Sequence, residues 1–411
     1  MNADLLIVGI GKLVQVRDTT PGFLAGPQMA SVPMIDNAWV AVKDGLILSW
    51  GTADNMPAME AREKWDAQGG WLFPGFVDSH THIVYAASRE EEFEMKIKGA
   101  TYEEIAARGG GILNSARRLQ QMSEDELFQR TMPRIREVMH TGTAAIEIKS
   151  GYGLTVRDEV KMLRVARRIG RETPLTVRTT FLGAHAVPRD TTKEKYIQTI
   201  LQEMIPAVAA EGLADYIDVF CEEGFFSQRE TEMIVGEGKR HGMTPRIHAN
   251  QLHRSGGVQA GVASGAISVD HLEQMGDEEI EILRNTKTMP TALPGAAFFL
   301  NLPFPPARKM IQAGLPLAIA SDFNPGSAPS GNMPLMLSLA CIRMKISPEE
   351  AINAATINTA YALNLLDKHG SISAGKVASF YVTRPLPSLA FLPYSFGSNL
   401  IQHVFLRGIR L

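Results

Sequence analysis

The sequence predicts an α/β fold: a (β/α)8 TIM barrel with a small β-sandwich that the N- and C-terminal segments form together. Between residues 72 and 365, apolar strand-like runs alternate with long helical patterns in eight strand–helix units, the number that closes such a barrel. The segments on either side are instead rich in β-branched and aromatic residues separated by turn signals. An open doubly wound sheet is the alternative, but Gly9–Gly11 lacks the spacing of a nucleotide-binding fingerprint.

Residues 1–71 and 366–411 supply the predicted sandwich. Strand patterns cover Asp4–Val16 and Trp39–Ser49, and Lys43–Gly45 has the composition of a hairpin turn. After residue 366, strand signals return at Gly375–Val382 and Val404–Leu411. Because both β-rich ends flank the barrel, we expect them to pair with each other.

The barrel itself, residues 72–365, is predicted from its two kinds of segment. The eight strand-like runs are Leu72–Asp78, Ala144–Lys149, Leu175–Leu182, Tyr216–Cys221, Thr244–His248, Ala266–Asp270, Thr288–Leu293 and Leu315–Ala320. The helical patterns include Glu124–Thr141, Arg157–Glu172, Lys193–Glu211, Gln228–His241, Pro305–Ala313 and Pro348–Leu366.

The composition is that of an ordinary globular protein. Of 411 residues, 45% are apolar and 21% charged, and the net charge of −3 provides no basic field for nucleic acid. No apolar run is long enough to cross a membrane, and the N-terminus lacks the basic region of a signal peptide. Cys221 and Cys341 are too few for a disulfide framework. We therefore expect a cytoplasmic protein with neither nucleic acid nor membrane as partner.

Polar residues that follow the barrel strands form the candidate site. His80 and His82 lie one residue apart at the end of an apolar run, so on a strand both imidazoles point to the same face. Further polar residues follow the third, fifth, sixth and eighth strands: His185, His248, His271 and Asp322. The working residues of such barrels lie at these strand ends, whereas structural histidines would scatter over the helices.

These residues together predict a metal centre. His80, His82, His248 and Asp322 offer a mixed nitrogen and oxygen ligand set that suits Zn²⁺ or Fe and leaves room for a water. A cation in such a site lowers the pKa of its bound water. We expect Asp322 to accept the proton, and His271 to polarise a substrate carbonyl or share the proton transfer.

Several motifs give the chain a resemblance to a known family. Pro74–His82 resembles the signature of the amidohydrolase superfamily, and other segments resemble the imidazolonepropionase family within it. These segments are Arg89 with Glu92–Glu94, Gly99–Ala106, Gly109–Ile112, Glu147–Leu154, Phe181–Ala186, Asp270–Glu273 and Ser321–Ser327. The resemblance extends from about residue 40 to the C-terminus.

The resemblance implies a reaction, a cofactor and substrate contacts. It implies hydrolysis of the cyclic amide of 4-imidazolone-5-propanoate to N-formimidoyl-L-glutamate, as a step of histidine degradation, with one divalent or trivalent metal ion per chain, Zn or Fe. Two-metal members commonly carry a modified lysine on the fourth strand, and Tyr216–Glu223 contains none, which favours one ion. The implied substrate contacts are Arg89, Tyr152, His185, Gln251, Asn324, Gly326 and Ser327, and Tyr102 is a further candidate contact. The partner is this small-molecule substrate, and a homodimer is one candidate assembly.

Some of these residues also have plainer interpretations. The guanidinium of Arg89 suits the propionate carboxylate, but Arg89 could simply be a solvated residue that heads the acidic run Glu90–Glu94. Tyr152 could donate its phenol to substrate or pack as a turn aromatic, and Tyr102 could merely open a helix. Lys149, at the end of the second strand, is best interpreted as a salt-bridge or positioning residue.

One departure and two alternatives remain. Asn250 stands where an acidic residue is expected in many relatives, while Gln251 can still donate and accept hydrogen bonds. Another cyclic-amide hydrolase, or a cytosine- or guanine-type deaminase on the same scaffold, would not need Arg89 for a propionate. A non-catalytic descendant typically loses metal ligands, and here all the strand-end residues are present.

Overall fold

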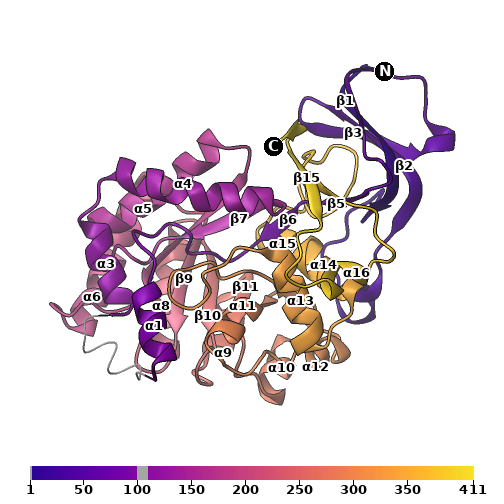
Figure 1. Ribbon diagram of the computed structural model, residues 1–411. Coiled ribbons are helices and arrows are strands. Elements are labelled where there is room, and N and C mark those ends of the chain that lie inside the picture. Colours follow the sequence, from indigo (N-terminus) through magenta and orange to yellow (C-terminus); the bar gives the residue numbers. More distant parts are fainter. Residues whose placement is uncertain (1, 100–109) are drawn as a thin grey trace.

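The computed structural model describes residues 2–99 and 110–411. Two sheets of eight strands organise this part of the chain (Figure 1). Tyr102, the helix predicted to begin there, and Gly109 lie outside the described residues. Within the described residues no helix is both long and apolar enough to cross a membrane.

The first sheet is the predicted barrel. Its parallel strands follow one another in chain order: β6 (Phe76–Asp78), β7 (Thr143–Lys149), β8 (Thr176–Ala184), β9 (Tyr216–Cys221), β10 (Thr244–Ala249), β11 (Ser268–His271), β12 (Met289–Ala292) and β13 (Ala318–Ile319). The segments after β6 and β13 meet, because the amide of Asp322 donates to the carbonyl of His80 and that of His82 to the carbonyl of Phe323. The barrel prediction is confirmed, and this seam brings the two ends of the metal-ligand set together.

Helices surround the barrel and connect its strands (Figure 1). They are α1 (Glu90–Ile97), α3 (Ile112–Gln120), α4 (Glu124–His140), α5 (Val156–Glu172), α6 (Lys193–Thr199), the π-helical η3 (Ile200–Met204), α7 (Ile205–Ala210), α8 (Gln228–Arg240), α9 (Gly257–Ser264), α10 (Asp277–Leu283), α11 (Pro294–Phe299), α12 (Ala307–Gln312), α13 (Met333–Met344), α14 (Pro348–Ala355), α15 (Ile357–Ala362) and α16 (Phe391–Tyr394). Hydroxyl side chains cap several N-termini, as at Ser123, Thr155 and Ser227, where each accepts a bond from a backbone amide of the first turn.

Two predicted elements are divided in the structure. The run Leu72–Asp78 is not one barrel strand: Trp71–Pro74 (β5) pairs in the terminal sheet and only Phe76–Asp78 enters the barrel. Gly75 lies at the change of sheet, where a side chain would meet the Cβ of Ala144 at 2.5 Å. The predicted helix Pro348–Leu366 breaks at Thr356, whose backbone is non-helical (φ −127°, ψ −80°).

The second sheet joins the two ends of the chain, as predicted. Its order is β16-β15-β14-β5-β1-β2-β3, with β4 also on β1. Besides β5, its strands are β1 (Asn2–Val14), β2 (Met34–Lys43), β3 (Leu46–Thr52), β4 (Glu60–Asp66), β14 (Phe380–Thr383), β15 (Ile401–Leu406) and β16 (Ile409–Arg410). The sheet has an apolar core of its own, with Ile7, Val40 and Phe405 among the buried residues. Domain boundaries at residues 71/72 and 365/366 remain predictions.

The predicted hairpin turn lies between β2 and β3. Asp44 and Gly45 both have positive φ, 52° and 73°, as two-residue turns between twisted strands require. An aspartate tolerates this conformation better than most side chains do, which explains why Asp-Gly signalled the turn.

Candidate metal centre and active site

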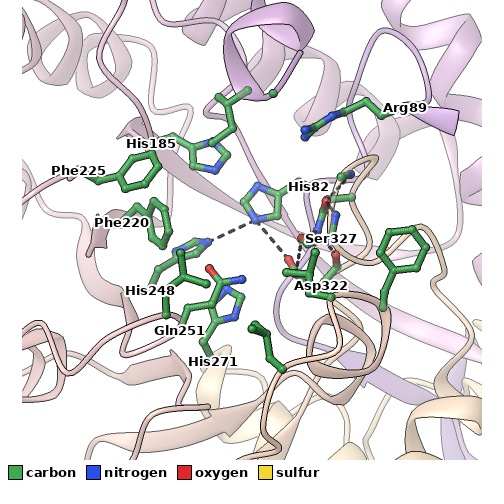
Figure 2. A pocket seen from close by; sticks show the side chains of 18 of the residues that line it. His82, Arg89, His185, Phe220, Phe225, His248, Gln251, His271, Asp322 and Ser327 are labelled. Atoms are coloured by element: carbon green, nitrogen blue, oxygen red, sulfur yellow. Dashed lines mark hydrogen bonds and ion pairs between the residues drawn. The ribbon is translucent and has the colours of Figure 1, made fainter. Parts of the chain in front are cut away.

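A cavity of about 760 Å³ opens at the C-terminal ends of the barrel strands (Figure 2). His82 follows β6, His185 follows β8, His248 lies on β10, His271 ends β11 and Asp322 follows β13. All five line this cavity, and His80 lies buried among them. The structure thus brings together every histidine and carboxylate that the strand-end pattern selected.

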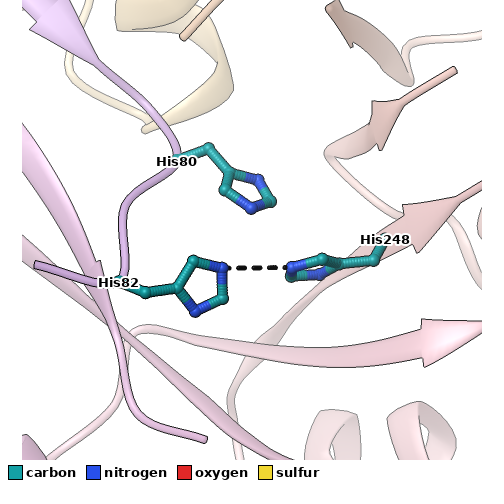
Figure 3. A group of neighbouring side chains, drawn as sticks. All are labelled: His80, His82 and His248. Atoms are coloured by element: carbon teal, nitrogen blue, oxygen red, sulfur yellow. Dashed lines mark hydrogen bonds between the residues drawn. The ribbon is translucent and has the colours of Figure 1, made fainter. Parts of the chain in front are cut away.

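Two overlapping groups of side chains bring ligand atoms within 4.8 Å of one another: His80, His82 and His248 form one, and His80, His271 and Asp322 form the other. The Nε2 atoms of His82 and His248 are 3.3 Å apart, and Oδ1 of Asp322 is 3.6 Å from Nε2 of both His80 and His82. Ligands held about 2.1 Å from one tetrahedral ion are separated by about 3.4 Å. Figure 3 shows the three imidazoles converging from two sides of the barrel. The spacing fits a single divalent metal ion.

The state of the imidazoles fits the same ion. His80, His82 and His248 are all buried, and burial is the largest of the effects that lower the pKa of each ring. Neutral rings offer the lone pairs that a metal needs. Among the described residues, Nε2 of His80 has no hydrogen-bond partner although it is fully buried, an arrangement that a cation would resolve.

Buried carboxylates contact two of these imidazoles at Nδ1. Asp270 lies 2.7 Å from Nδ1 of His80, and Asp218 lies 2.9 Å from Nδ1 of His248. Such a contact fixes the ring orientation and leaves Nε2 free for the metal. Burial alone would raise the pKa of Asp218, but His248 and Lys149 outweigh it and hold this pKa well below its usual value.

Two buried cationic side chains, Lys149 and Arg246, bind the carboxylates that contact the imidazoles. Nζ of Lys149 donates to Glu147 at 2.7 Å and to Asp218 at 2.9 Å, so Lys149 makes the salt bridges expected of it. Arg246 donates to Asp270 at 2.9 Å. Sequence reasoning missed Asp218, Asp270 and Arg246, although charged residues inside otherwise apolar strands were a visible signal.

Asp322 and His271 lie beside each other in the candidate metal centre. Their backbones have positive φ, 56° and 88°, a strained conformation for residues other than glycine that clusters at functional sites. Burial raises the pKa of Asp322 to about 6, and its Oδ2 accepts a bond from Ser327 at 3.1 Å. Burial would lower the pKa of His271, but Glu273, 3.4 Å from Nδ1, outweighs it and raises this pKa.

The predicted substrate contacts gather around the same cavity. Arg89, Tyr152, His185, Gln251, Asn324, Gly326 and Ser327 all line it. Arg89 reaches toward the cavity from one side and Gln251 and His271 from another (Figure 2). The last predicted contact, Tyr102, lies outside the described residues.

Hydrogen bonds organise the loop after β13. Oδ1 of Asn324 accepts from the amides of Gly326 and Ser327 at 2.7 and 2.8 Å. A Cβ at Gly326 would meet the guanidinium of Arg89 at 2.1 Å, so a larger residue there would have to displace that side chain. This loop therefore places Ser327 against Asp322 and the Gly326 backbone against Arg89.

Asn250, the departure noted in the sequence, lies behind the cavity. It is fully buried, and its amide donates to the carbonyl of Gln274 at 3.3 Å. Its neighbour Gln251 lines the cavity instead. Because Asn250 does not line the cavity, an asparagine in place of an acidic residue leaves the groups that line the cavity unchanged.

Comparison with known proteins agrees with this geometry. A sequence profile described as the amidohydrolase family matches residues 71–409. An imidazolonepropionase of Christiangramia forsetii is 52% identical over 406 residues, which cover 98% of this chain and 99% of that protein. Another, of Caldanaerobacter subterraneus subsp. tengcongensis, is 39% identical and covers 98% of this chain and 97% of its own. The chain belongs to the imidazolonepropionase family, within the amidohydrolases.

Solved structures share the fold at low sequence identity. Guanine deaminase of E. coli superimposes with a TM-score of 0.73 at 16% identity, covering 99% of this chain and 98% of that one. An adenosine deaminase of Xanthomonas campestris, with bound zinc, gives 0.72 at 17% identity and covers 100% and 93%. Imidazolonepropionases and these deaminases therefore share one scaffold, and the expectation of a barrel hydrolase is confirmed.

Proposed function

We propose that this chain hydrolyses the cyclic amide of 4-imidazolone-5-propanoate to N-formimidoyl-L-glutamate. The observation that carries the proposal is one cavity lined both by the His and Asp ligand cluster and by Arg89. A ligand cluster can activate water, and a guanidinium can hold a carboxylate. The substrate presents the matching groups, a ring amide and a propionate. Family membership supports the same reaction.

We further propose that the metal is a single Zn²⁺ or Fe ion held by His80, His82, His248 and Asp322. When bound, it supplies a Lewis acid and an activated water. Three nitrogen ligands and one carboxylate suit these metals better than Mg²⁺ or Ca²⁺, which prefer oxygen. The fourth barrel strand, Tyr216–Cys221, carries no lysine to bridge a second ion.

In the proposed reaction, water adds to the ring carbonyl carbon and the bond from that carbon to the ring nitrogen breaks. Asp322 accepts the proton of the water, because its carboxylate lies among the ligand nitrogens, with Oδ1 3.6 Å from Nε2 of both His80 and His82. Ser327, bonded to Oδ2, keeps the carboxylate oriented. His271 stands beside Asp322 and Glu273, where it can polarise the carbonyl or pass a proton to the leaving nitrogen.

The substrate would lie between the ligand cluster and Arg89. We propose that Arg89 binds the propionate, and that Tyr152, His185 and Gln251 surround the ring. His185 has Nδ1 engaged with the carbonyl of Gly151 at 2.9 Å, which leaves Nε2 for the substrate. Asn324, Gly326 and Ser327 would contribute through the loop after β13.

An assay of imidazolone-propanoate loss on the purified chain, with and without chelator, tests this proposal. We expect turnover that the chelator abolishes. Ammonia release from guanine, cytosine and adenosine, measured on the same preparation, tests the alternative of a deaminase on this scaffold. Deamination of one of these three compounds without loss of imidazolone-propanoate would overturn the proposed reaction.

A further inference from the structure

Arg89 does not offer the cavity a free positive charge. Its Nε donates to Oε2 of Glu92 at 2.9 Å, its Nη2 pairs with the same oxygen, and both side chains are nearly buried. Glu92 is itself fixed, because its Oε1 accepts the amide of Gly111 at 3.0 Å. The Arg89–Glu92 pair is therefore neutral as a unit, and a substrate carboxylate added to it would leave a net negative charge.

Lys96 lies one helical turn beyond Glu92 on α1, and it lines the same cavity as Arg89. Lys96 and Arg89 both line the active-site cavity and the smaller hollow of about 180 Å³ beside it. The side chain is half-buried, and among the described residues it forms no ion pair. Burial and the charge of Arg89 lower the pKa of Lys96 while Glu92 opposes them, as expected for groups that lie close together.

We propose that Lys96 is a second cation of the carboxylate subsite and that it determines specificity for substrates with an anionic side chain. Arg89 and Lys96 are the charged side chains that line both the cavity and the hollow, whereas the exposed Glu90 lines only the hollow and the exposed Glu223 only the cavity. Among the described residues, Lys96 is therefore the cation shared by both spaces that no carboxylate pairs with, and it can match one substrate carboxylate. The four-carbon stem allows the ammonium to move toward an anion while Arg89 remains fixed by Glu92. The inference rests on the proposed function, because it concerns the propionate of the proposed substrate.

The residue that caps the C-terminus of α1 provides a matched control. Lys98 is two residues away from Lys96, its side chain is 70% exposed, and it pairs with Glu94 at 2.5 Å. It does not line the cavity. Lys98→Met therefore makes the same chemical change next to the same helix without touching the proposed subsite.

The test compares Lys96→Met, Lys96→Arg and Lys98→Met in the metal-loaded enzyme. Because hydrogen bonds to charged groups are the stronger ones, we expect Lys96→Met to raise KM for imidazolone-propanoate about 10-fold with kcat within about twofold. Lys96→Arg should restore most of the affinity, and Lys98→Met should behave as wild type. A KM in Lys96→Met equal to that of Lys98→Met overturns the inference.

A binding measurement separates this inference from the proposed reaction. Calorimetry with 3-(imidazol-4-yl)propanoate and its neutral amide needs no turnover. We expect wild type to prefer the carboxylate over the amide and Lys96→Met to lose about 10-fold of that preference. Equal weakening of both compounds would indicate a merely structural role and overturn the inference. If wild type binds the carboxylate selectively but does not turn over imidazolone-propanoate, the proposed reaction fails and the subsite stands.

Discussion

His82 and His248 approach from opposite sides of the barrel until their Nε2 atoms are 3.3 Å apart. One lies after the first strand and the other on the fifth, so the closed sheet itself sets this distance. Burial lowers the pKa of both rings, so both are neutral and can offer a nitrogen lone pair to a metal. In the absence of an ion, one ring can donate its Nε2 proton to the other, and a shared cation would take the place of that proton.

Removal of the metal should therefore reduce both activity and stability. We expect chelation to lower activity to about 1% or less, and Zn²⁺ or Fe to restore it, since the ion supplies the activated water. The melting temperature should fall as well, because a ligand that binds only the folded state stabilises it. Elemental analysis of the untreated protein should give about one metal per chain. A ratio near two would contradict the single-metal assignment, and chelator saturated with Zn²⁺ beforehand is the control.

The proton-accepting role proposed for Asp322 predicts a severe defect in Asp322→Asn. The amide keeps the shape of the carboxylate but loses a metal ligand and a base together, so we expect kcat to fall about 1,000-fold or more. Ser327→Ala removes the 3.1 Å bond to Oδ2, together with the 2.6 Å bond that this hydroxyl accepts from Nδ2 of Asn324, and should cost about 10-fold. Metal content measured on both variants shows whether loss of the ion explains the defect. Near-normal kcat in Asp322→Asn would exclude it as the base.

The sequence predicted the candidate metal ligands, but it did not predict the carboxylates that contact and orient them. Parallel strands in a closed barrel end at one face, so residues that directly follow apolar runs, such as His82 and Asp322, could be brought together without coordinates. Asp218 and Asp270 sit inside strands that the apolar pattern treats as core. The contact of Asp218 with His248 depends on the register of β9 and β10, and that of Asp270 with His80 joins strand β11 to the segment after β6, which is not its neighbour in the sheet. No local pattern specifies either contact.

Arg89 illustrates a different limit. The sequence offered two interpretations, a carboxylate ligand or a solvated arginine that heads the acidic run Glu90–Glu94. In the structure the side chain is 13% exposed, lines the cavity and pairs with Glu92 of that run, so it is not solvated. The pairing with Glu92 does not conflict with the first interpretation, because one guanidinium has donors for more than one carboxylate.

The close approach of Gly326 to Arg89 predicts that Gly326→Ala mimics loss of the arginine. A Cβ at residue 326 would meet Nη1 of Arg89 at 2.1 Å and must displace it. We expect both Gly326→Ala and Arg89→Met to raise KM for the propionate substrate by about 10-fold to 100-fold, and the double variant to be no worse than Arg89→Met. Gly236→Ala, where the added methyl meets open space on α8, should leave KM unchanged. Additive effects of the two cavity substitutions would contradict this coupling.

The carboxylates behind the ligands predict a defect in metal affinity. Asp218→Asn and Asp270→Asn preserve shape but weaken the hold on His248 and His80, so we expect the metal dissociation constant to rise about 10-fold to 100-fold. Competition with a metal indicator on the purified protein measures this without reference to activity. Asp215→Asn is the control, because Asp215 pairs with Arg167 and Arg178 away from the cavity. Unchanged affinity in both test variants would show that ring orientation is set by packing alone.

A buried histidine outside the active site predicts the acid sensitivity of the fold. His369 is 4% exposed, and its Nε2 lies 2.9 Å from the hydroxyl of Thr176 at the start of β8. Burial, followed by the charges of Lys376 and Arg407, lowers the pKa of His369 to about 3. In the unfolded chain the same ring titrates near its usual value of about 6.5.

The sign of the effect follows from proton binding. Between about pH 6.5 and about pH 3 the unfolded chain binds a proton at residue 369 that the folded chain does not, so stability falls as the pH falls through this window. His369→Gln cannot take up that proton and keeps an amide to bond Thr176. We therefore expect the free energy of unfolding to decline less steeply from about pH 6.5 to about pH 5 in His369→Gln than in wild type. His140→Gln, at an exposed position ending α4, makes the same change on the surface. Urea unfolding of the three proteins across this range decides the matter, and parallel declines in all of them would show that His369 is not the group responsible.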